Sequence, residues 1–131
     1  MNARLMSWRR LDLRTPLKEE QVTAALTALA TLSGSPFITL EARGSDRQVS
    51  WRVGCDARHL SRVLDAITPH LPGLQVSDLP DREDLPDAAA RLALKGSAHR
   101  PLGSDVALTT TRTLLAALAR AGRHESLTLQ L

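Results

Sequence analysis

Aromatic side chains are scarce in this sequence, which contains two Trp, one Phe and no Tyr among 131 residues. The hydrophobic core must therefore be largely aliphatic, with Ala and Leu as its main components. The 43% hydrophobic content is sufficient for such a core and disfavours disorder. The length fits one domain, or two very small domains packed together.

Cysteine and long apolar runs are also scarce. The single Cys55 excludes an intramolecular disulfide and leaves the cellular compartment undefined. No apolar stretch approaches the ~18 residues that a membrane-crossing helix needs. The chain does not open with the charged and then apolar pattern of a secretory signal. We therefore expect a cytoplasmic segment with no membrane insertion of its own.

A glycine-rich phosphate-binding loop is absent from the sequence. In "ALKGSAHRPLGSD", Lys95 precedes Gly96, which reverses the Gly-Lys order that a P-loop needs. No Gly-x-Gly-x-x-Gly pattern follows an expected strand. The sequence therefore predicts no nucleotide hydrolysis, no catalytic residue and no cofactor.

Basic residues exceed acidic residues only slightly, with 17 Lys and Arg against 14 Asp and Glu. Fifteen of the 17 are Arg, a bias that fits a GC-rich genome. A formal charge of +3 permits weak attraction to nucleic acid or anionic lipid without requiring it.

Apolar residues recur with periods of two and of 3.6, which predict an alternation of strands and helices. Thr15 and Asp56 are expected to cap helices, and Gly44 is expected to provide the positive φ of a hairpin turn. The expected elements are a strand (5–13), a helix (15–34), a hairpin (36–55), a helix (56–69), a strand (74–79), a strand (88–96), a helix (104–121) and a strand (126–131).

This order predicts an α+β fold with a mostly antiparallel sheet and helices on one face. Residues 1–80 match a ferredoxin-like β-α-β-β-α-β unit, 81–88 form an acidic loop containing Pro, and 89–131 form a further β-α-β unit packed with the first. The closing "HESLTLQL" alternates to the last residue, so we expect a piece of a longer protein. Two arrangements stay open for the last unit: it completes the first sheet, or it pairs with chain beyond it.

Residues with metal-binding or nucleophilic chemistry are present but not grouped. Cys55 and His59 have helical spacing, yet a metal site needs three or four ligands. Cys55 is better interpreted as a buried thiol at a strand end than as a nucleophile. Glu41, Arg52 and His59 are the only candidates for a small-ligand site. The acidic residues of the loop lack calcium-loop spacing and are interpreted as solvated: Asp78, Asp81, Glu83, Asp84 and Asp87.

Arginines in the expected hairpin are the candidate contacts to nucleic acid or to a partner: Arg43, Arg47 and Arg52. Phe37 and Trp51 are the aromatic residues there that bases could stack on. Trp51 has the same parity as Val49 and Val53, which favours a place in the core. A nucleic-acid-binding module with weak DNA contact is thus an alternative function.

The sequence also resembles a known family. The resemblance rests on "SPFITLEARGSDRQVSWRVGC", "LPGLQVSDLPD", "AARLALKGSAHRPLGSDVALTTTRTLLAAL" and "ESLTLQL", and it covers nearly the whole chain. These stretches resemble the N-terminal region of actinobacterial type IV secretion (conjugative DNA-transfer) ATPases.

That family implies a membrane-associated oligomeric machine that couples nucleotide hydrolysis to the movement of DNA or protein. The Walker motifs that do this are missing here, so no catalytic residue carries over. The resemblance implies a non-catalytic docking domain that is cytoplasmic and peripheral to the ATPase. It would contact proteins of the secretion complex, the rest of its own chain or a second copy.

Overall fold

The computed structural model of the chain describes residues 6–79, 87–91 and 107–130. Its strands are β1 (Met6–Leu13), β2 (Ile38–Ser45), β3 (Gln48–Asp56), β4 (Leu74–Asp78) and β5 (Ser126–Gln130). Its helices are α1 (Glu19–Ala30), α2 (Leu60–Ile67) and α3 (Ala107–Ala119), and a 3-10 turn η1 (Thr68–His70) follows α2. The expected α+β class is confirmed.

The strands form one sheet in the order β4-β1-β3-β2-β5, and every neighbouring pair is antiparallel. The last strand therefore joins the same sheet as the first four. Its pairing with β2 runs from Ser45 opposite Ser126 to Glu41 opposite Gln130. Of the two arrangements that the sequence left open, the structure has the one in which β5 extends the first sheet.

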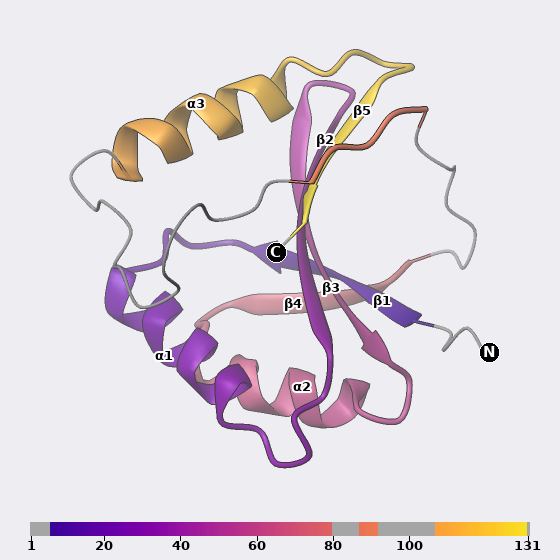
Figure 1. The fold of residues 1–131 in the computed structure, drawn as a ribbon. Helices are drawn as coiled ribbons and strands as arrows, with labels where there is room; N and C mark the ends of the chain where they lie inside the picture. Colours follow the sequence, from indigo (N-terminus) through magenta and orange to yellow (C-terminus); the bar gives the residue numbers. More distant parts are fainter. Residues whose placement is uncertain (1–5, 80–86, 92–106, 131) are drawn as a thin grey trace, which may run out of the picture.

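The three α-helices lie on one side of the sheet; in Figure 1, α1 and α3 lie to the left of the strands and α2 lies below β4. Helices α1 and α2 lie side by side against one end of the sheet, and α3 lies near the tip of the β2–β3 hairpin. The expectation of helices on one face is met by these described helices. The opposite side of the sheet carries no described helix.

The core lies between the sheet and the α1–α2 pair. Val53 and Cys55 of β3 pack with Val63 and Ile67 of α2, and all four side chains are nearly or fully buried. The apolar stripe predicted for this helix is therefore confirmed. Helix α1 contributes less, because Ala25 is its only fully buried residue and Val22 and Leu26 of its predicted stripe are exposed.

The turn between β2 and β3 differs from the prediction. The residues with positive φ are Asp46 (50°) and Arg47 (59°), which connect the paired Ser45 and Gln48 in a two-residue turn of the type I′ kind. Gly44 lies inside β2 and is needed for another reason. A Cβ atom on Gly44 would lie 1.8 Å from the carbonyl oxygen of Leu118, so glycine allows α3 to approach the strand closely.

The hairpin turn is bonded to the end of α3. The backbone N–H of Asp46 donates to the carbonyl of Gly122 at 3.0 Å, and that of Arg47 donates to the carbonyl of Ala121 at 2.7 Å. Carbonyl groups at the C-terminal end of a helix lack hydrogen-bond partners within the helix. The hairpin turn provides donors for the carbonyls of Ala121 and Gly122, which directly follow α3. The turn and the end of α3 thus form one unit although they are far apart in sequence.

Two helix starts differ from the prediction. Helix α1 begins at Glu19, and the backbone N–H of Lys18 donates to Oε1 of Gln21 at 2.9 Å. Thr15 does not cap this helix; its hydroxyl donates to the carbonyl of Pro72 at 3.1 Å. Helix α2 begins at Leu60, four residues after the predicted cap Asp56.

The part of the chain before α3 is described only partly. Residues 88–91, at the start of the strand predicted over 88–96, have no regular structure. Residues 92–96, and 104–106 of the predicted helix, lie outside the described residues. Leu118 and Leu115 face inward as predicted, with Leu118 buried, whereas Leu114 is exposed.

Candidate functional site

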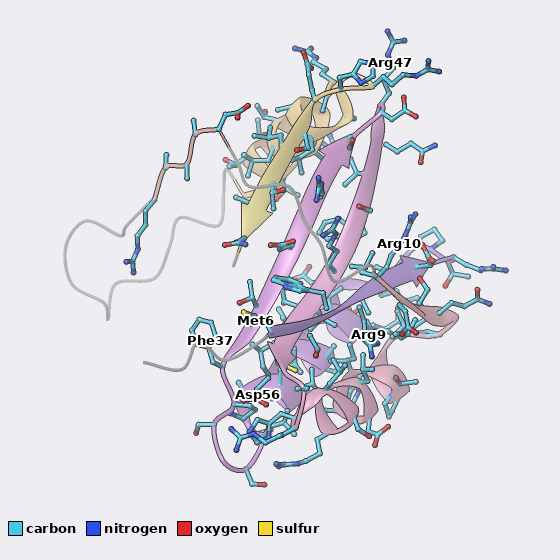
Figure 2. The ribbon with its side chains drawn as sticks, turned by 90° about the vertical axis from the view of Figure 1, so that its right-hand side faces the viewer. Met6, Arg9, Arg10, Phe37, Arg47 and Asp56 are labelled. Carbon is cyan, nitrogen blue, oxygen red and sulfur yellow. The ribbon has the colours of Figure 1, made fainter. Side chains whose placement is uncertain are left out.

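The sheet side away from the helices is here called the polar face. Strand pairing places neighbouring residues of different strands on the same face, so the register of the five strands defines its members. Most of them are polar or charged, and Figure 2 looks onto this side. The polar and charged members are Arg10, Asp12, Thr39, Glu41, Arg43, Ser45, Gln48, Ser50, Arg52, Asp56, Gln75, Ser77, Ser126, Thr128 and Gln130, and the others are Met6, Trp8 and Gly54.

One row of side chains crosses all five strands of this face. In sheet order it is Ser77, Arg10, Arg52, Glu41 and Gln130. The amide nitrogen of Gln130 donates to Oε1 of Glu41, while Oε2 of Glu41 lies 4.0 Å from Nη1 of Arg52. The carboxylate of Glu41 thus lies between an amide and a guanidinium in the middle of the sheet.

Glu41 and Arg52 are both largely withdrawn from water, with side-chain exposures of 4% and 11%. Burial lowers the pKa of Arg52, as do the nearby charges of Arg43 and Arg10, while Glu41 opposes the effect. Arg10 itself forms an ion pair with Asp12 at 3.1 Å. The negative charges of Asp12 and Glu41 therefore partly neutralise the positive charges of the neighbouring Arg10 and Arg52.

The candidate contacts from the sequence, Arg43, Arg47 and Arg52, do not form one group. Arg43 pairs with Ser50 and is a diagonal neighbour of Arg52 on the polar face. Arg47 is a turn residue at the far end of the hairpin, as Figure 2 shows, and it is exposed. The structure therefore brings Arg43 and Arg52 together and leaves Arg47 with the end of α3.

One end of the polar face is apolar. Met6 pairs with Asp56, and Phe37 immediately precedes Ile38, which pairs with Cys55. Figure 2 shows Met6 and Phe37 at the same end of the face. Their exposed fractions are 36% for Met6 and 78% for Phe37. Met6, Phe37 and the half-buried Trp8 are called the apolar end from here on.

The side chain of Trp8 lies over Gly54. Trp8 pairs with Gly54, which in turn pairs with Thr39, so the three occupy one row across β1, β3 and β2. A Cβ atom on Gly54 would lie 2.6 Å from Cε3 of the indole ring. Glycine at this position therefore allows a flat aromatic ring to rest against the backbone of the sheet, which fixes its orientation.

Gly54→Ala is expected to push the indole ring of Trp8 away from the sheet and expose it to water. In a Trp51→Phe background, where Trp8 is the only tryptophan, the emission maximum should shift to longer wavelength. The free energy of unfolding, measured with urea, should fall by only about 1–2 kcal/mol, because the clash is with a side chain that can move and not with the backbone. Unchanged emission would contradict the packing of Trp8 on Gly54.

Asp56 ends β3 beside the apolar end and is paired locally. Its carboxylate accepts hydrogen bonds from Nε and Nη2 of Arg58 at 3.1 and 2.9 Å, and from the backbone N–H of Arg58 at 3.0 Å. These hydrogen bonds lower the pKa of Asp56 to about 2. The side chain thus stays charged at neutral pH and orders the turn before α2 without capping the helix.

The other chemical candidates do not combine into a site. Cys55 is fully buried on the helix side, and burial together with the charge of Asp56 raises the pKa of its thiol, which agrees with an inert thiol. His59 lies in the turn before α2, away from the Glu41–Arg52 pair. Within the described part of the chain, no three or more His, Cys, Asp or Glu side chains are grouped as metal ligands.

Trp51 lies on the helix side, as its shared parity with Val53 predicted, but it is 41% exposed instead of buried. Its row on that side lies between the part of the sheet that α1 and α2 cover and Gly44, which α3 covers. The sequence does not predict that Trp51 is left partly uncovered between the helices, because this depends on where α3 packs on the sheet.

Sequence reasoning missed the apolar end. The parity of the first strand already separated Trp8 from Leu11, but the partner of Trp8 and the exposure of Phe37 depend on strand register.

Comparison of the chain with protein-family models, curated proteins and solved structures finds no match. Among the described residues, no helix is both long and apolar enough to span a membrane.

Proposed function

We propose that this chain is a non-catalytic docking domain that binds a segment of another polypeptide on its polar face. The observation that carries the proposal is the apolar end. Met6 and Phe37 are exposed beside the half-buried Trp8, on a side of the sheet that no described helix covers. Trp, Phe, Met and Arg are the residue types enriched at protein interfaces, and all four occur here.

The charges of the polar face favour a protein over a nucleic acid as its occupant. The arginine Arg10 is paired with Asp12, and Arg52 lies beside Glu41, so carboxylates are interspersed among the guanidinium groups. A phosphate backbone needs an excess of cations and is repelled by carboxylates. A polypeptide can instead place an apolar side chain on the apolar end, where Met6 and Phe37 are exposed.

The apolar end is also preorganised for binding. Because Trp8 rests on Gly54, its ring has little freedom to lose when a partner covers it. Rigid aromatic anchors of this kind bind with a smaller entropic penalty than mobile side chains.

The proposal also includes the family and the finer fold. The strand order β4-β1-β3-β2 supports a ferredoxin-like arrangement of the first six elements, to which β5 adds a fifth strand. We propose that the domain serves a type IV secretion or conjugation ATPase, on the basis of the sequence resemblance. This part predicts that the reading frame continues past Leu131 and encodes a glycine-rich phosphate-binding loop.

The docking function can be tested with peptides selected on the protein from a random phage-displayed library. Selected peptides are expected to carry a large apolar residue, and Phe37→Ser or Trp8→Ala should weaken their binding at least about tenfold, as loss of a central aromatic anchor does. Val22→Ser is the matched control, because Val22 is an exposed apolar residue on α1, on the other side of the sheet.

Binding that survives Phe37→Ser and Trp8→Ala but is lost in Val22→Ser would contradict the proposal. Concentration-dependent dimerisation of the wild type that Phe37→Ser abolishes would assign the apolar end to a second copy of this chain instead.

A further inference from the structure

Three arginines from two distant parts of the chain meet at the tip of the β2–β3 hairpin. Arg47 belongs to the turn, and its backbone N–H bonds to Ala121, which directly follows Arg120. The adjacent Asp46 bonds to Gly122, which directly precedes Arg123. These two hydrogen bonds hold the backbone of Arg47 next to the segment that carries Arg120 and Arg123, and the three residues are here called the arginine tip.

The arginine tip has the exposure and the local charge of an anion site. All three of its arginines are exposed. The acidic neighbours are Asp46 and Glu125, and Oε2 of Glu125 accepts a hydrogen bond from the backbone N–H of Gly122 at 3.0 Å. That carboxylate is therefore engaged with the end of α3. Unlike Arg10 and Arg52 of the polar face, none of the three arginines forms an ion pair with a carboxylate of the described residues.

The backbone beneath the arginine tip is fixed rather than loose. The tight turn has Asp46 and Arg47 in the left-handed region, at φ of 50° and 59°. Asp adopts this conformation readily in such turns, but Arg rarely does, so surrounding contacts must hold Arg47 in it. The hydrogen bonds to Ala121 and Gly122 provide those contacts and fix the position of Arg47 next to the end of α3.

We propose that the arginine tip binds the phosphodiester backbone of nucleic acid. Guanidinium groups are planar and donate paired hydrogen bonds to phosphate oxygens, and they stay charged at any physiological pH. Three of them on a fixed support can neutralise neighbouring phosphates without reading the base sequence. This site is separate from the apolar end, so it does not depend on the docking proposal.

The composition of the tip favours nucleic acid over a lipid surface. Binding to a membrane surface usually requires apolar side chains to insert, or clusters of about four to eight basic residues. Residues 45–48 and 120–125 include no large apolar side chain and have three arginines. The site thus has the charge for a phosphate backbone and lacks the residues that would anchor it in a bilayer.

The test is a fluorescence anisotropy titration with a labelled DNA duplex of mixed sequence, repeated over a range of salt concentrations. Wild-type binding should weaken steeply with salt. The double change Arg120→Ala with Arg123→Ala should reduce the slope of log K against log salt by about 1.8, because each phosphate that is no longer neutralised lowers it by about 0.9. Arg47→Gly should reduce the slope by about 0.9 and leave the turn intact, because glycine accepts positive φ.

The matched control removes the same charge elsewhere, as Arg14→Ala with Arg112→Ala, two exposed arginines outside the tip. The slope should stay close to that of the wild type. Thermal melting followed by circular dichroism shows that each variant is folded. The proposal is overturned if the wild type does not bind the duplex, or if the control pair lowers the slope as much as the tip pair. It is also overturned if vesicles of phosphatidylserine bind through these arginines and DNA does not.

Discussion

Replacing Gly44 with alanine is expected to detach helix α3 from the sheet and to lower the free energy of unfolding by about 3 kcal/mol, the upper range for overpacking. The added Cβ atom would lie 1.8 Å from the carbonyl oxygen of Leu118 and 2.7 Å from its Cα atom. Both are backbone atoms, so no rotation of a side chain can relieve the clash. The helix must move away, which exposes Leu118, now 2% exposed.

Urea unfolding measures the loss of stability, and hydrogen exchange of residues 107–119 measures whether α3 itself is released. Gly122→Ala is the matched control. A Cβ atom there would meet Oε2 of Glu125 at 3.5 Å, an ordinary contact, and Gly122 is not among the residues with positive φ. If Gly44→Ala is as stable as the control and its α3 amides stay protected, the close packing of α3 on β2 is wrong.

The same variant links the fold to the arginine tip. If α3 moves away from β2, the bonds from Asp46 and Arg47 to the end of the helix also break. Arg120 and Arg123 then separate from Arg47, and duplex binding should fall together with hydrogen-exchange protection of α3. The docking of peptides at the apolar end should persist, because Trp8 and Gly54 lie outside this region.

Ile67→Ala is expected to lower the free energy of unfolding by about 2–5 kcal/mol, as for other large-to-small changes in a packed core. Ile67 is 2% exposed and lies in the last turn of α2, where it joins the cluster of Val53, Cys55 and Val63. The loss combines the transfer of buried methyl groups to water with the cavity that remains. Urea unfolding monitored by circular dichroism measures it.

Val76→Ala provides the control for this change, because Val76 lies on the edge strand β4 and is 40% exposed. This substitution should alter stability by less than about 1 kcal/mol. Equal effects of the two substitutions would show that the core is not centred on α2.

The elements of the fold were largely predictable, because local periodicity carries most of the information. Leu60, Val63 and Ile67 recur at helical spacing, and the structure buries all three. The sequence assigned the positive φ of the hairpin turn to Gly44, because glycine adopts this conformation most readily. In the structure, Asp46 and Arg47 have the positive φ, and Gly44 instead allows Leu118 of α3 to approach the strand. This contact joins residues far apart in the sequence, so the residues around Gly44 do not predict it.

The candidate surfaces were less predictable for the same reason. The sequence identified Arg47 as a possible contact, but its neighbours Arg120 and Arg123 lie just after α3, about 75 residues further along the chain. The packing of Trp8 on the sheet depends on the strand register, which places it opposite Gly54. The arginine tip and the packing of Trp8 both depend on contacts between residues far apart in the sequence. The apolar stripe of α2 depends only on residues three or four positions apart.

The two tryptophans provide the most direct test of the docking claim, because they lie on opposite faces of the sheet. Their indole N–H signals can be assigned in nitrogen-15 NMR spectra from the Trp8→Phe and Trp51→Phe variants. A titration with the selected peptide should shift the signal of Trp8 and leave that of Trp51 in place. A shift of Trp51 with an unchanged Trp8 signal would place the binding surface on the helix side and contradict the account.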